Sequence, residues 1–292
     1  MKIQAKISLA MSAAFIVGLA LASVGAYYIV DRNAREDSLQ NARIMIEGAS
    51  AIRTYTSESV SPLLQQQMKI EFLPYAIPSF AAQTNFRLVQ RKLPEYSYRE
   101  PTLNPTNPSD KPAEWEAEII NQFRDYPDKA ELVTIRDTPA GPFLTLARPL
   151  KVGSERCLVC HSTADKAPPT MTALYGTQNG FGWKLGEIVG AQVVSIPLAV
   201  PLARAQRTFL LFVAALAGTF IVVILLVYLL LSFIVVKPVK EISDMASEVS
   251  LGKLNAPELV SRSQDEIGSL AASFTRMRRS VEESLRMLEM QR

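Results

Sequence analysis

Two uninterrupted apolar runs divide the chain into its main parts. Residues 7–30 and residues 208–236 contain no charged side chain. Each run exceeds the roughly 20 residues that cross the hydrocarbon core of a bilayer, so the pattern predicts two transmembrane helices. For the first run a cleaved signal peptide is the alternative, with Lys2 and Lys6 as its basic start and the small residues at 24–26 as its cleavage site.

Basic residues at the ends of these runs indicate the orientation. Lys2 and Lys6 precede the first run, and Lys237 and Lys240 follow the second, so both ends are expected in the cytoplasm. The expected organisation is a cytoplasmic N-terminus at 1–6, a transmembrane helix at 7–30, an extracytoplasmic domain at 31–207, a transmembrane helix at 208–236, a cytoplasmic domain at 237–288 and a tail at 289–292.

Helical spacing continues beyond the first apolar run. It predicts an amphipathic helix that extends outward and stops near Pro62, with an apolar face of Ala42, Ile46, Ala49 and Ile52. Prolines crowd residues 94–112, which predicts an irregular surface loop. Asp110 can cap the helix expected after this loop, whose apolar stripe consists of Trp115, Ile119 and Phe123.

The pattern then changes to strands. Residues 131–137 and 143–147 flank a Pro- and Gly-containing turn and predict a hairpin. Residues 148–156 are predicted to form a loop. Residues 186–197 are apolar and predict a buried strand, which a short basic connector joins to the second apolar run. Helices followed by antiparallel strands indicate an α+β fold.

The only histidine of the chain directly follows its only two cysteines, in Cys157-Leu158-Val159-Cys160-His161. One helical turn brings both thiols to one side, where each can add to a vinyl group of haem. The adjacent imidazole can then bind the iron as its proximal ligand. The spacing therefore predicts one covalently bound haem c, with Cys157 and Cys160 as attachment residues and His161 as the iron ligand.

Three other uses of this motif are open. A disulfide across a two-residue gap would close a small, strained loop that adds little stability. A thiol-redox motif usually opens a helix after a strand, whereas a loop is predicted before Cys157. A zinc site needs about four ligands, and the sequence has no further cysteine or histidine to supply them.

The sixth position of the iron has several candidates. A second histidine is absent from the sequence, which leaves a thioether, a phenolate or an open position that suits a diatomic gas. An open position is the leading expectation. Among the side chains, Met68 is the first candidate for the distal ligand because it follows the amphipathic helix that continues the first apolar run, here called the stalk helix; the other candidates are Met45, Met171 and Tyr55. Arg148 and Arg156 are nearest in sequence for pairing with the haem propionates.

After the second apolar run, apolar residues alternate in steps of three and four. One stretch ends at Gly252, and a connector holds Leu254 and Leu259. The residues of the two stretches are Val239, Ile242, Ala246 and Val249, then Ile267, Leu270, Phe274, Met277, Val281, Leu285 and Leu288. Together with Pro238 and the Asp-Glu-Ile-Gly sequence at 265–268, this segment resembles a HAMP domain. The resemblance implies half of a parallel, dimeric four-helix bundle that relays motion from a membrane helix.

The predicted extracytoplasmic domain at 31–207 also contains several distinctive motifs. They are Phe-Leu-Pro-Tyr-Ala-Ile-Pro-Ser-Phe-Ala-Ala at 72–82, Tyr-Ser-Tyr-Arg-Glu-Pro-Thr-Leu-Asn-Pro-Thr-Asn-Pro at 96–108, Trp115, the Cys157–His161 motif and Gly-Trp-Lys-Leu-Gly-Glu-Ile-Val-Gly-Ala-Gln at 182–192. Together they resemble the PAS-like haem c sensor domains of cyanobacterial and proteobacterial membrane proteins. The resemblance implies a PAS-like sheet with helices and one covalent haem. Some members of that family use a cysteine as sixth ligand, but this sequence has no third cysteine.

These features give one functional hypothesis and one alternative. The hypothesis is a receptor of the bacterial inner membrane, with a periplasmic haem c sensor domain that detects redox state or a diatomic gas and a cytoplasmic HAMP domain. The expected partners are a second copy of the chain, through HAMP and stalk, and a separate cytoplasmic signalling protein. The alternative is a membrane-anchored cytochrome for electron transfer. No nucleophile or general-base pair accompanies the motif, so no enzyme is expected, and a net charge of +3 does not indicate a nucleic-acid partner.

Overall fold

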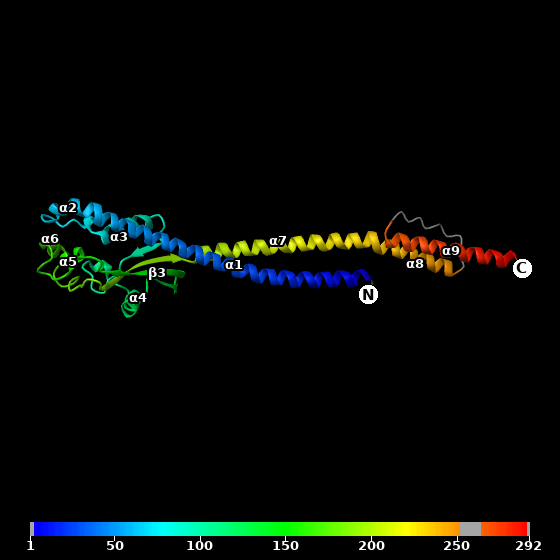
Figure 1. Ribbon diagram of the computed structural model, residues 1–292, viewed down its shortest axis with the longest axis horizontal. Helices are drawn as coiled ribbons and strands as arrows, with labels where there is room; N and C mark the ends of the chain where they lie inside the picture. The colour runs from blue at the N-terminus through cyan, green and yellow to red at the C-terminus, as the bar shows by residue number, and fades with distance from the viewer. Residues whose placement is uncertain (1–2, 252–263, 291–292) are drawn as a thin grey trace. The chain divides into compact units, whose positions relative to one another are not determined.

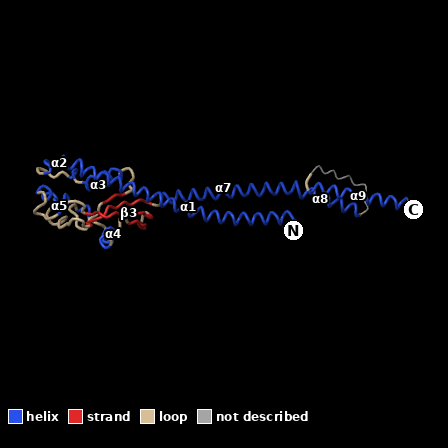
Figure 2. The backbone as a smooth tube through the Cα atoms, in the orientation of Figure 1, coloured by secondary structure: helices blue, strands red, loops and turns tan. Residues whose placement is uncertain are grey.

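The computed structural model describes residues 3–251 and 264–290. The chain forms two compact units. One comprises Tyr27–Thr208 and contains the sheet; the other combines the residues before Tyr27 with those from Phe209 onward. Figures 1 and 2 show the helices and strands of each unit. The predicted connector positions Gly252, Leu254 and Leu259 lie outside the described residues.

A four-stranded antiparallel sheet forms the centre of the first unit. Its strands have the spatial order β1-β4-β3-β2. Their bounds are Ser97–Arg99 for β1, Leu132–Thr138 for β2, Gly141–Lys151 for β3 and Ile188–Pro197 for β4. Strands β2 and β3 form the predicted hairpin, with Thr138 paired to Gly141 across a two-residue turn. Gly141 has φ +105°, a backbone conformation that favours glycine.

Helices cover both faces of this sheet (Figure 2). On one face, α1 (Ile3–Tyr55) and α3 (Pro78–Gln90) pack on β1, β3 and β4. On the other face, α4 (Glu114–Asp125) packs on β3 and β4 through Ile119, Ile120 and Phe123. All residues of β4 are buried, as expected for a central strand with both faces covered. Sequence and structure thus agree on a mixed helix and sheet fold.

The predicted face of the stalk helix is confirmed. Ala42, Ile46 and Ala49 are fully buried, because their helical spacing places them on the face that meets the sheet. Ile52 packs at the edge of the same core.

The predicted end of this helix at Pro62 is wrong. After α1 the chain continues through a π-helical turn, η1 (Thr56–Val60), into α2 (Ser61–Met68). Proline lacks an N–H and its ring crowds the carbonyl four residues earlier. The wider π turn, in which the Ser61 N–H bonds to the Thr56 carbonyl, accommodates Pro62 at the start of α2. A second π turn, η4 (Ser232–Val236), precedes Pro238 in the same way.

The proline-rich segment 94–112 is not the surface loop that its composition predicts. It contains β1, the short helix η3 (Pro108–Asp110) and the buried residues Tyr98, Glu100 and Thr102. Asp110 does not cap α4 either. Instead, the Glu116 carboxylate accepts from the Ala113 N–H at 2.8 Å and closes the first turn of α4. The strand was missed because three residues are too few for a periodic signal.

A buried ion pair links the stalk helix to the sheet. Arg53 of α1 pairs with Glu100, whose side chain is fully buried. The Tyr98 hydroxyl donates to Glu100 at 2.7 Å and accepts from the Gln192 amide at 2.9 Å. Burial, followed by the neighbouring Glu100 charge, raises the pKa of Tyr98, so its hydroxyl stays protonated and remains a donor. The network connects α1, β1 and β4 through polar contacts.

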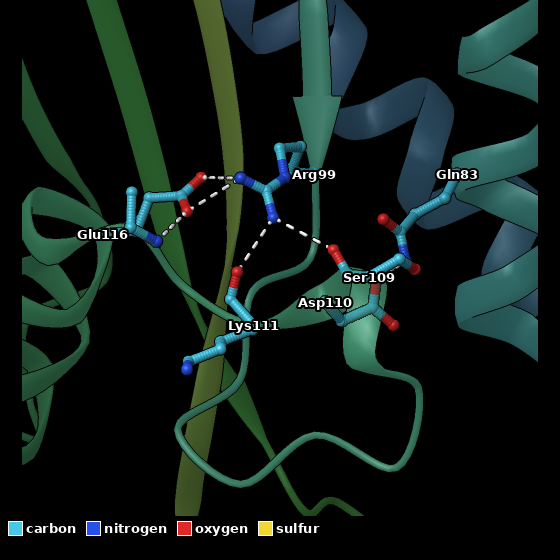
Figure 3. A network of polar contacts seen from close by, with 7 residues as sticks. Gln83, Arg99, Ser109, Asp110, Lys111 and Glu116 are labelled. Atoms are coloured by element: carbon cyan, nitrogen blue, oxygen red, sulfur yellow. Dashed lines mark hydrogen bonds and ion pairs between the residues drawn. The ribbon is translucent and has the colours of Figure 1, made fainter. Parts of the chain in front are cut away.

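A second network fixes the loop after β1 (Figure 3). The Arg99 guanidinium donates to both carboxylate oxygens of Glu116 and to the carbonyls of Ser109 and Lys111. Beside it, the Gln83 amide donates to the Asp110 carboxylate at 3.0 Å. The cation thus satisfies a buried carboxylate and two loop carbonyls, which holds the loop against α3 and α4.

The second unit contains the apolar helices and the C-terminal pair. Two stretches, within Gln4–Met68 and Ala199–Ser250, are long and apolar enough to cross a membrane. Helix α7 spans Ala199–Leu231, so the predicted basic connector is the first part of this helix. Helices α8 (Lys237–Ser250) and α9 (Glu266–Met290) follow. They pack through Ile242, Ala271 and Phe274.

The ends and faces of the C-terminal helices follow the predicted pattern in part. The Asp265 carboxylate accepts from the Gly268 N–H at 2.9 Å and caps α9. Ile267 and Phe274 pack against α8, as their heptad spacing predicts. Leu270, Met277 and Val281 are exposed in the single chain.

We predict that Arg53→Met lowers the free energy of unfolding by about 3 kcal/mol, because it leaves the buried Glu100 carboxylate without a counter-charge. The matched control is Arg43→Met on the same helix. Arg43 and Glu131 form a more exposed pair at 2.6 Å, worth about 0–1 kcal/mol. Both tryptophans lie in the sheet-containing unit, so denaturant unfolding of the full chain followed by tryptophan fluorescence measures the difference. Equal losses of unfolding free energy in the two variants would contradict the role of Arg53 as the counter-charge of a buried carboxylate.

We predict that Asp110→Asn stabilises the protein at neutral pH. Burial, followed by the Glu100 charge, raises the pKa of Asp110 against the opposing Gln83 hydrogen bond. A raised pKa means that the protonated carboxyl stabilises the fold at low pH, and that this stabilisation is lost as pH rises through the folded-state pKa. The amide of Asn does not titrate. Thermal melts between about pH 4 and pH 7 should show a gain for the variant that shrinks as the pH falls; a gain that is constant with pH would refute this explanation.

Candidate functional site

The cysteine motif lies on a short helix that begins close to the sheet. Strand β3 ends at Lys151, and α5 spans Glu155–His161. The connection is fixed by Val152, whose N–H donates to the Glu187 carbonyl and whose carbonyl accepts from the Gly186 N–H, both at 2.9 Å. Because β4 begins right after this contact, the sheet positions α5.

The two thiols share one side of α5. Cys157 and Cys160 are three residues apart in a helix, a spacing that places side chains on the same face. Both are half-buried and neither forms a disulfide. Burial, and to a lesser extent the neighbouring Cys157, raises the pKa of the Cys160 thiol. The geometry allows both sulfurs to react with one partner molecule.

The loop predicted at 148–156 is wrong over its first half, because β3 continues to Lys151. The motif therefore does open a helix shortly after a strand, which removes one of the grounds against a thiol-redox site. The surrounding sheet is antiparallel throughout, unlike the βαβ context in which that motif is expected. The environment of the histidine becomes the deciding feature.

His161 is the last residue of α5, and its ring is held on two sides. Its Nδ1 lies 2.7 Å from the carbonyl oxygen of Gly180 and 3.5 Å from the Thr106 hydroxyl. The ring stacks on Trp183 with centroids 3.9 Å apart and an interplanar angle of 13°. A carbonyl can only accept, so the hydrogen lies on Nδ1 and the Nε2 lone pair is left for another partner.

Electrostatics favour the neutral form of this ring. Burial lowers the pKa of His161, and the Gly180 carbonyl opposes this only in part. Neutral imidazole, with one nitrogen hydrogen-bonded to a carbonyl and the other free, is the form in which histidine binds metals. The site therefore presents two thiols and one oriented nitrogen donor.

Backbone hydrogen bonds tie the residues just after Gly180 and Phe181 to α5. The Gly182 N–H donates to the Ser162 carbonyl at 2.9 Å, and the Trp183 N–H donates to the His161 carbonyl at 3.1 Å. Gly180 is buried and has φ +85°, and a Cβ atom there would lie 1.9 Å from the Thr106 hydroxyl oxygen. Only glycine fits between this loop and the histidine.

Three elements distant in sequence meet near α5. The Arg156 guanidinium donates to the Ser57 carbonyl in the π turn η1 at 3.2 Å. The Thr170 hydroxyl of α6 (Pro169–Tyr175) donates to the Met68 carbonyl at the end of α2 at 3.0 Å. Phe72 and Tyr175 contact edge to face with centroids 5.7 Å apart. The stalk end and the motif are thus tied together directly.

The candidate distal ligands lie in different surroundings. Met68 ends α2, and its sulfur accepts from the Leu73 N–H at 3.1 Å. Met171 is buried in α6, next to the residue that contacts Met68. Met45 packs at the core between stalk and sheet, and Tyr55 is 65% exposed. The structure joins the Met68 carbonyl to Thr170, the neighbour of Met171 in sequence, and places Met45 at the edge of the core between stalk and sheet.

The two arginines proposed for propionates have protein partners. Arg148 pairs with Glu47 at 2.6 Å and with Glu131 at 3.7 Å. Arg156 donates to the stalk. Both cations therefore already contribute to contacts between the sheet or α5 and the stalk helix.

Sequence reasoning assigned no role to Asn104, Thr106, Gly180 and Trp183. Their partners are separated from them by roughly 20 to 80 residues in sequence, which no local pattern reveals. One signal was available: a lone metal-ligating histidine needs an acceptor for its second nitrogen, and the glycine-rich segment 176–186 offers carbonyls with unusual backbone conformations.

Comparison with known proteins identifies two regions. Residues 31–197 match the family model described as Tll0287-like, and residues 230–283 match that of the HAMP domain. A search of curated proteins finds no match. Among solved structures, the crystal structure of the cyanobacterial heme-protein Tll0287 is similar, with 17% identity and a TM-score of 0.44 over 55% of this chain and 95% of that chain. Because the first family model covers more than half of the 292 residues, the chain belongs to the Tll0287-like family, here followed by a HAMP domain.

Proposed function

We propose that this protein is a membrane receptor that senses through one covalently bound haem c and relays the signal through its HAMP domain. The observation that carries the proposal is the hydrogen bond from His161 Nδ1 to the Gly180 carbonyl beside two free thiols. It leaves Nε2 available at the end of a Cys-x-x-Cys-His motif. The relative's printed title, which names a heme-protein, agrees with this assignment.

The residues present fit the proposed group. Cys157 and Cys160 share a helix face and can each form one thioether. The neutral, oriented imidazole of His161 can bind the iron. Large apolar side chains are exposed on the elements that meet there, as suits a flat apolar cofactor: Leu63, Ile70, Val159 and Leu174. When bound, haem supplies an iron that changes redox state or takes up a small ligand.

Each residue of the site has a distinct role in this proposal. The thioethers keep the group attached, so the sensor cannot lose it. Trp183 stacks on the imidazole and keeps the ring from rotating. The Gly180 carbonyl holds the Nδ1 hydrogen. For the sixth position of the iron we propose an open site that can take a diatomic gas, with Met68 as the candidate protein ligand.

The stalk is the proposed route for the signal. Helix α5 contacts the π turn through Arg156 and Ser57. Turns of this type have irregular backbone hydrogen bonds, so η1 can adopt a second arrangement more easily than the helix on either side. On the N-terminal side of this turn, Arg53 and Glu100 fix α1 to the sheet. Strand β4 leads into α7 after Leu198, whose N–H donates to the Pro142 carbonyl. Both apolar helices are therefore attached to the domain that contains the motif.

The HAMP domain provides the output in this proposal. Leu270, Met277 and Val281 share a heptad face of α9 that is exposed in one chain. A second copy would bury this face in a parallel four-helix bundle. We place the PAS-like sensor domain in the periplasm and the HAMP domain in the cytoplasm of a bacterial inner membrane. We propose no catalytic reaction for either domain.

We predict that the full chain, matured in cells that attach c-type haem, keeps its haem through denaturing electrophoresis. The double variant Cys157→Ser/Cys160→Ser loses the covalent haem, because no thiol remains to form a thioether. Haem-dependent peroxidase staining of the gel measures attachment. The matched control is Ser154→Ala, one turn earlier, whose hydroxyl lies 3.8 Å from the Cys157 sulfur. A wild-type chain without covalent haem would overturn the proposed function.

We predict that Arg156→Ala weakens the transmission of the haem state to the first apolar helix, because the π turn that Arg156 contacts continues directly into α1. Loss of one exposed hydrogen bond, worth about 1 kcal/mol, should reduce the redox-dependent difference in cross-linking about fivefold. Cross-linking between two copies through an introduced Leu21→Cys, at an exposed position of α1, in membranes with ferric and then ferrous haem, measures this difference. The control is Arg124→Ala, whose exposed pair with Glu187 at 3.9 Å lies away from the stalk. An unchanged difference in Arg156→Ala would exclude this route.

A further inference from the structure

We propose that Asn104 is the positioning residue of the histidine: it holds the Gly180 carbonyl on His161 Nδ1 and thereby fixes which ring nitrogen is free. Asn104 belongs to the loop after β1, 57 residues before the histidine in sequence. Its side-chain amide hydrogen-bonds to the Gly180 N–H and the Phe181 carbonyl. Its effect is transmitted through the backbone at 180–182, and the part of the inference that concerns iron rests on the proposed function.

The side-chain amide of Asn104 forms a two-pronged contact. Its Oδ1 accepts from the Gly180 N–H at 3.1 Å, and its Nδ2 donates to the Phe181 carbonyl at 3.2 Å. These two backbone groups belong to the peptide units immediately before and after the unit whose carbonyl accepts from His161. Holding both neighbours fixes the plane between them, because each peptide unit is rigid.

The backbone of this segment has few other restraints. Its backbone hydrogen bonds to α5 begin at Gly182 and Trp183. Within the described residues, Gly180 and Phe181 donate no backbone-to-backbone hydrogen bond outside the helices and strands. Gly180 also has φ +85°, so this glycine could rotate to other conformations at little cost. The Asn104 amide is the contact that selects the observed one.

Thr106 completes the loop without replacing Asn104. Its hydroxyl lies 3.5 Å from His161 Nδ1, against 2.7 Å for the Gly180 carbonyl. The longer distance is at the limit of hydrogen bonding. Thr106 instead fills the space that a side chain at position 180 would need. If Gly180 turned away, however, the Thr106 hydroxyl could serve as donor to Nδ1, and the ring hydrogen would then move to Nε2.

Asn104 prevents the Thr106 hydroxyl from replacing the Gly180 carbonyl as the partner of His161 Nδ1. With the hydrogen on Nε2, the nitrogen that the proposed function assigns to iron would be blocked. With the hydrogen on Nδ1 and bonded to a carbonyl, the free nitrogen is also a stronger donor to a metal. One exposed amide side chain thus controls both the availability and the basicity of the ligand.

The test uses the full chain in lipid nanodiscs, labelled with ¹⁵N-histidine. The sequence contains one histidine, so the spectrum contains one imidazole. In haem-free protein near pH 8, above the ordinary imidazole pKa of about 6.5, we expect the wild type to show the Nδ1–H tautomer alone. Asn104→Ala should lose this single form and show a mixture with Nε2–H. An Asn104→Ala spectrum identical to that of the wild type would overturn the inference.

Three further variants separate positioning from general damage. Asn107→Ala removes another loop asparagine, whose side-chain oxygen accepts from the Ser109 N–H within its own turn, and should leave the tautomer unchanged. Asn104→Asp keeps the acceptor for Gly180 N–H and should restore the wild-type form in part. Thr106→Ala should also show the same tautomer of His161 as the wild type. A mixture of tautomers in Asn107→Ala would mean that the loop as a whole positions the ring. A mixture in Thr106→Ala would mean that the Thr106 hydroxyl positions it. Either result would contradict the role of Asn104.

A second readout concerns the haem-loaded chain. Weaker hydrogen bonding at Nδ1 makes the imidazole a poorer donor, so the ferric form is less stabilised. The midpoint potential of Asn104→Ala should therefore move to more positive values than that of Asn107→Ala, and equal potentials would contradict the inference. If the wild type binds no haem, the proposed function fails, whereas the haem-free tautomer measurement still decides the role of Asn104.

Discussion

The pairing of β4 between β1 and β3 is the constraint on which the rest of the sensor unit depends. All ten residues of β4 are buried, and both sheet faces receive helices at this strand. The start of β4 fixes the Val152 turn from which α5 follows, and its end leads into α7. The same strand therefore fixes the turn before the cysteine motif and continues directly into α7.

Charged groups determine how the stalk sits on this sheet. An apolar helix face with Ala42, Ile46 and Ala49 could slide or rotate at modest cost, since apolar contacts have no preferred direction. The Arg53–Glu100 pair can form in only one register. A buried pair of this kind adds little net stability. We therefore regard it as a device that selects the stalk position rather than one that strengthens the fold.

Local patterns in the sequence were enough for the main elements and for the motif. The hairpin, β4, the face of α1 and the two C-terminal helices all follow from the spacing of apolar residues. Predictions failed where distant contacts decide the structure. Pro62 lies inside a continuous helical path because a π turn accommodates it. The proline-rich loop is half-buried because Glu100 and Arg99 find partners on other helices. The Gly180 carbonyl, which accepts from His161 Nδ1, could not be predicted because it lies in a segment of irregular backbone without a periodic sequence pattern.

The proposed mechanism joins these parts at the π turn, where Arg156 of the motif helix contacts the Ser57 carbonyl. A sensor needs two states whose free energies the iron can bias. The most direct test is amide hydrogen exchange of residues 55–61 in the full chain, with ferric and with ferrous haem. We expect reduction of the haem to change exchange in this turn and to leave the buried amides of β4 equally protected. Identical exchange at 55–61 in both redox states would contradict it.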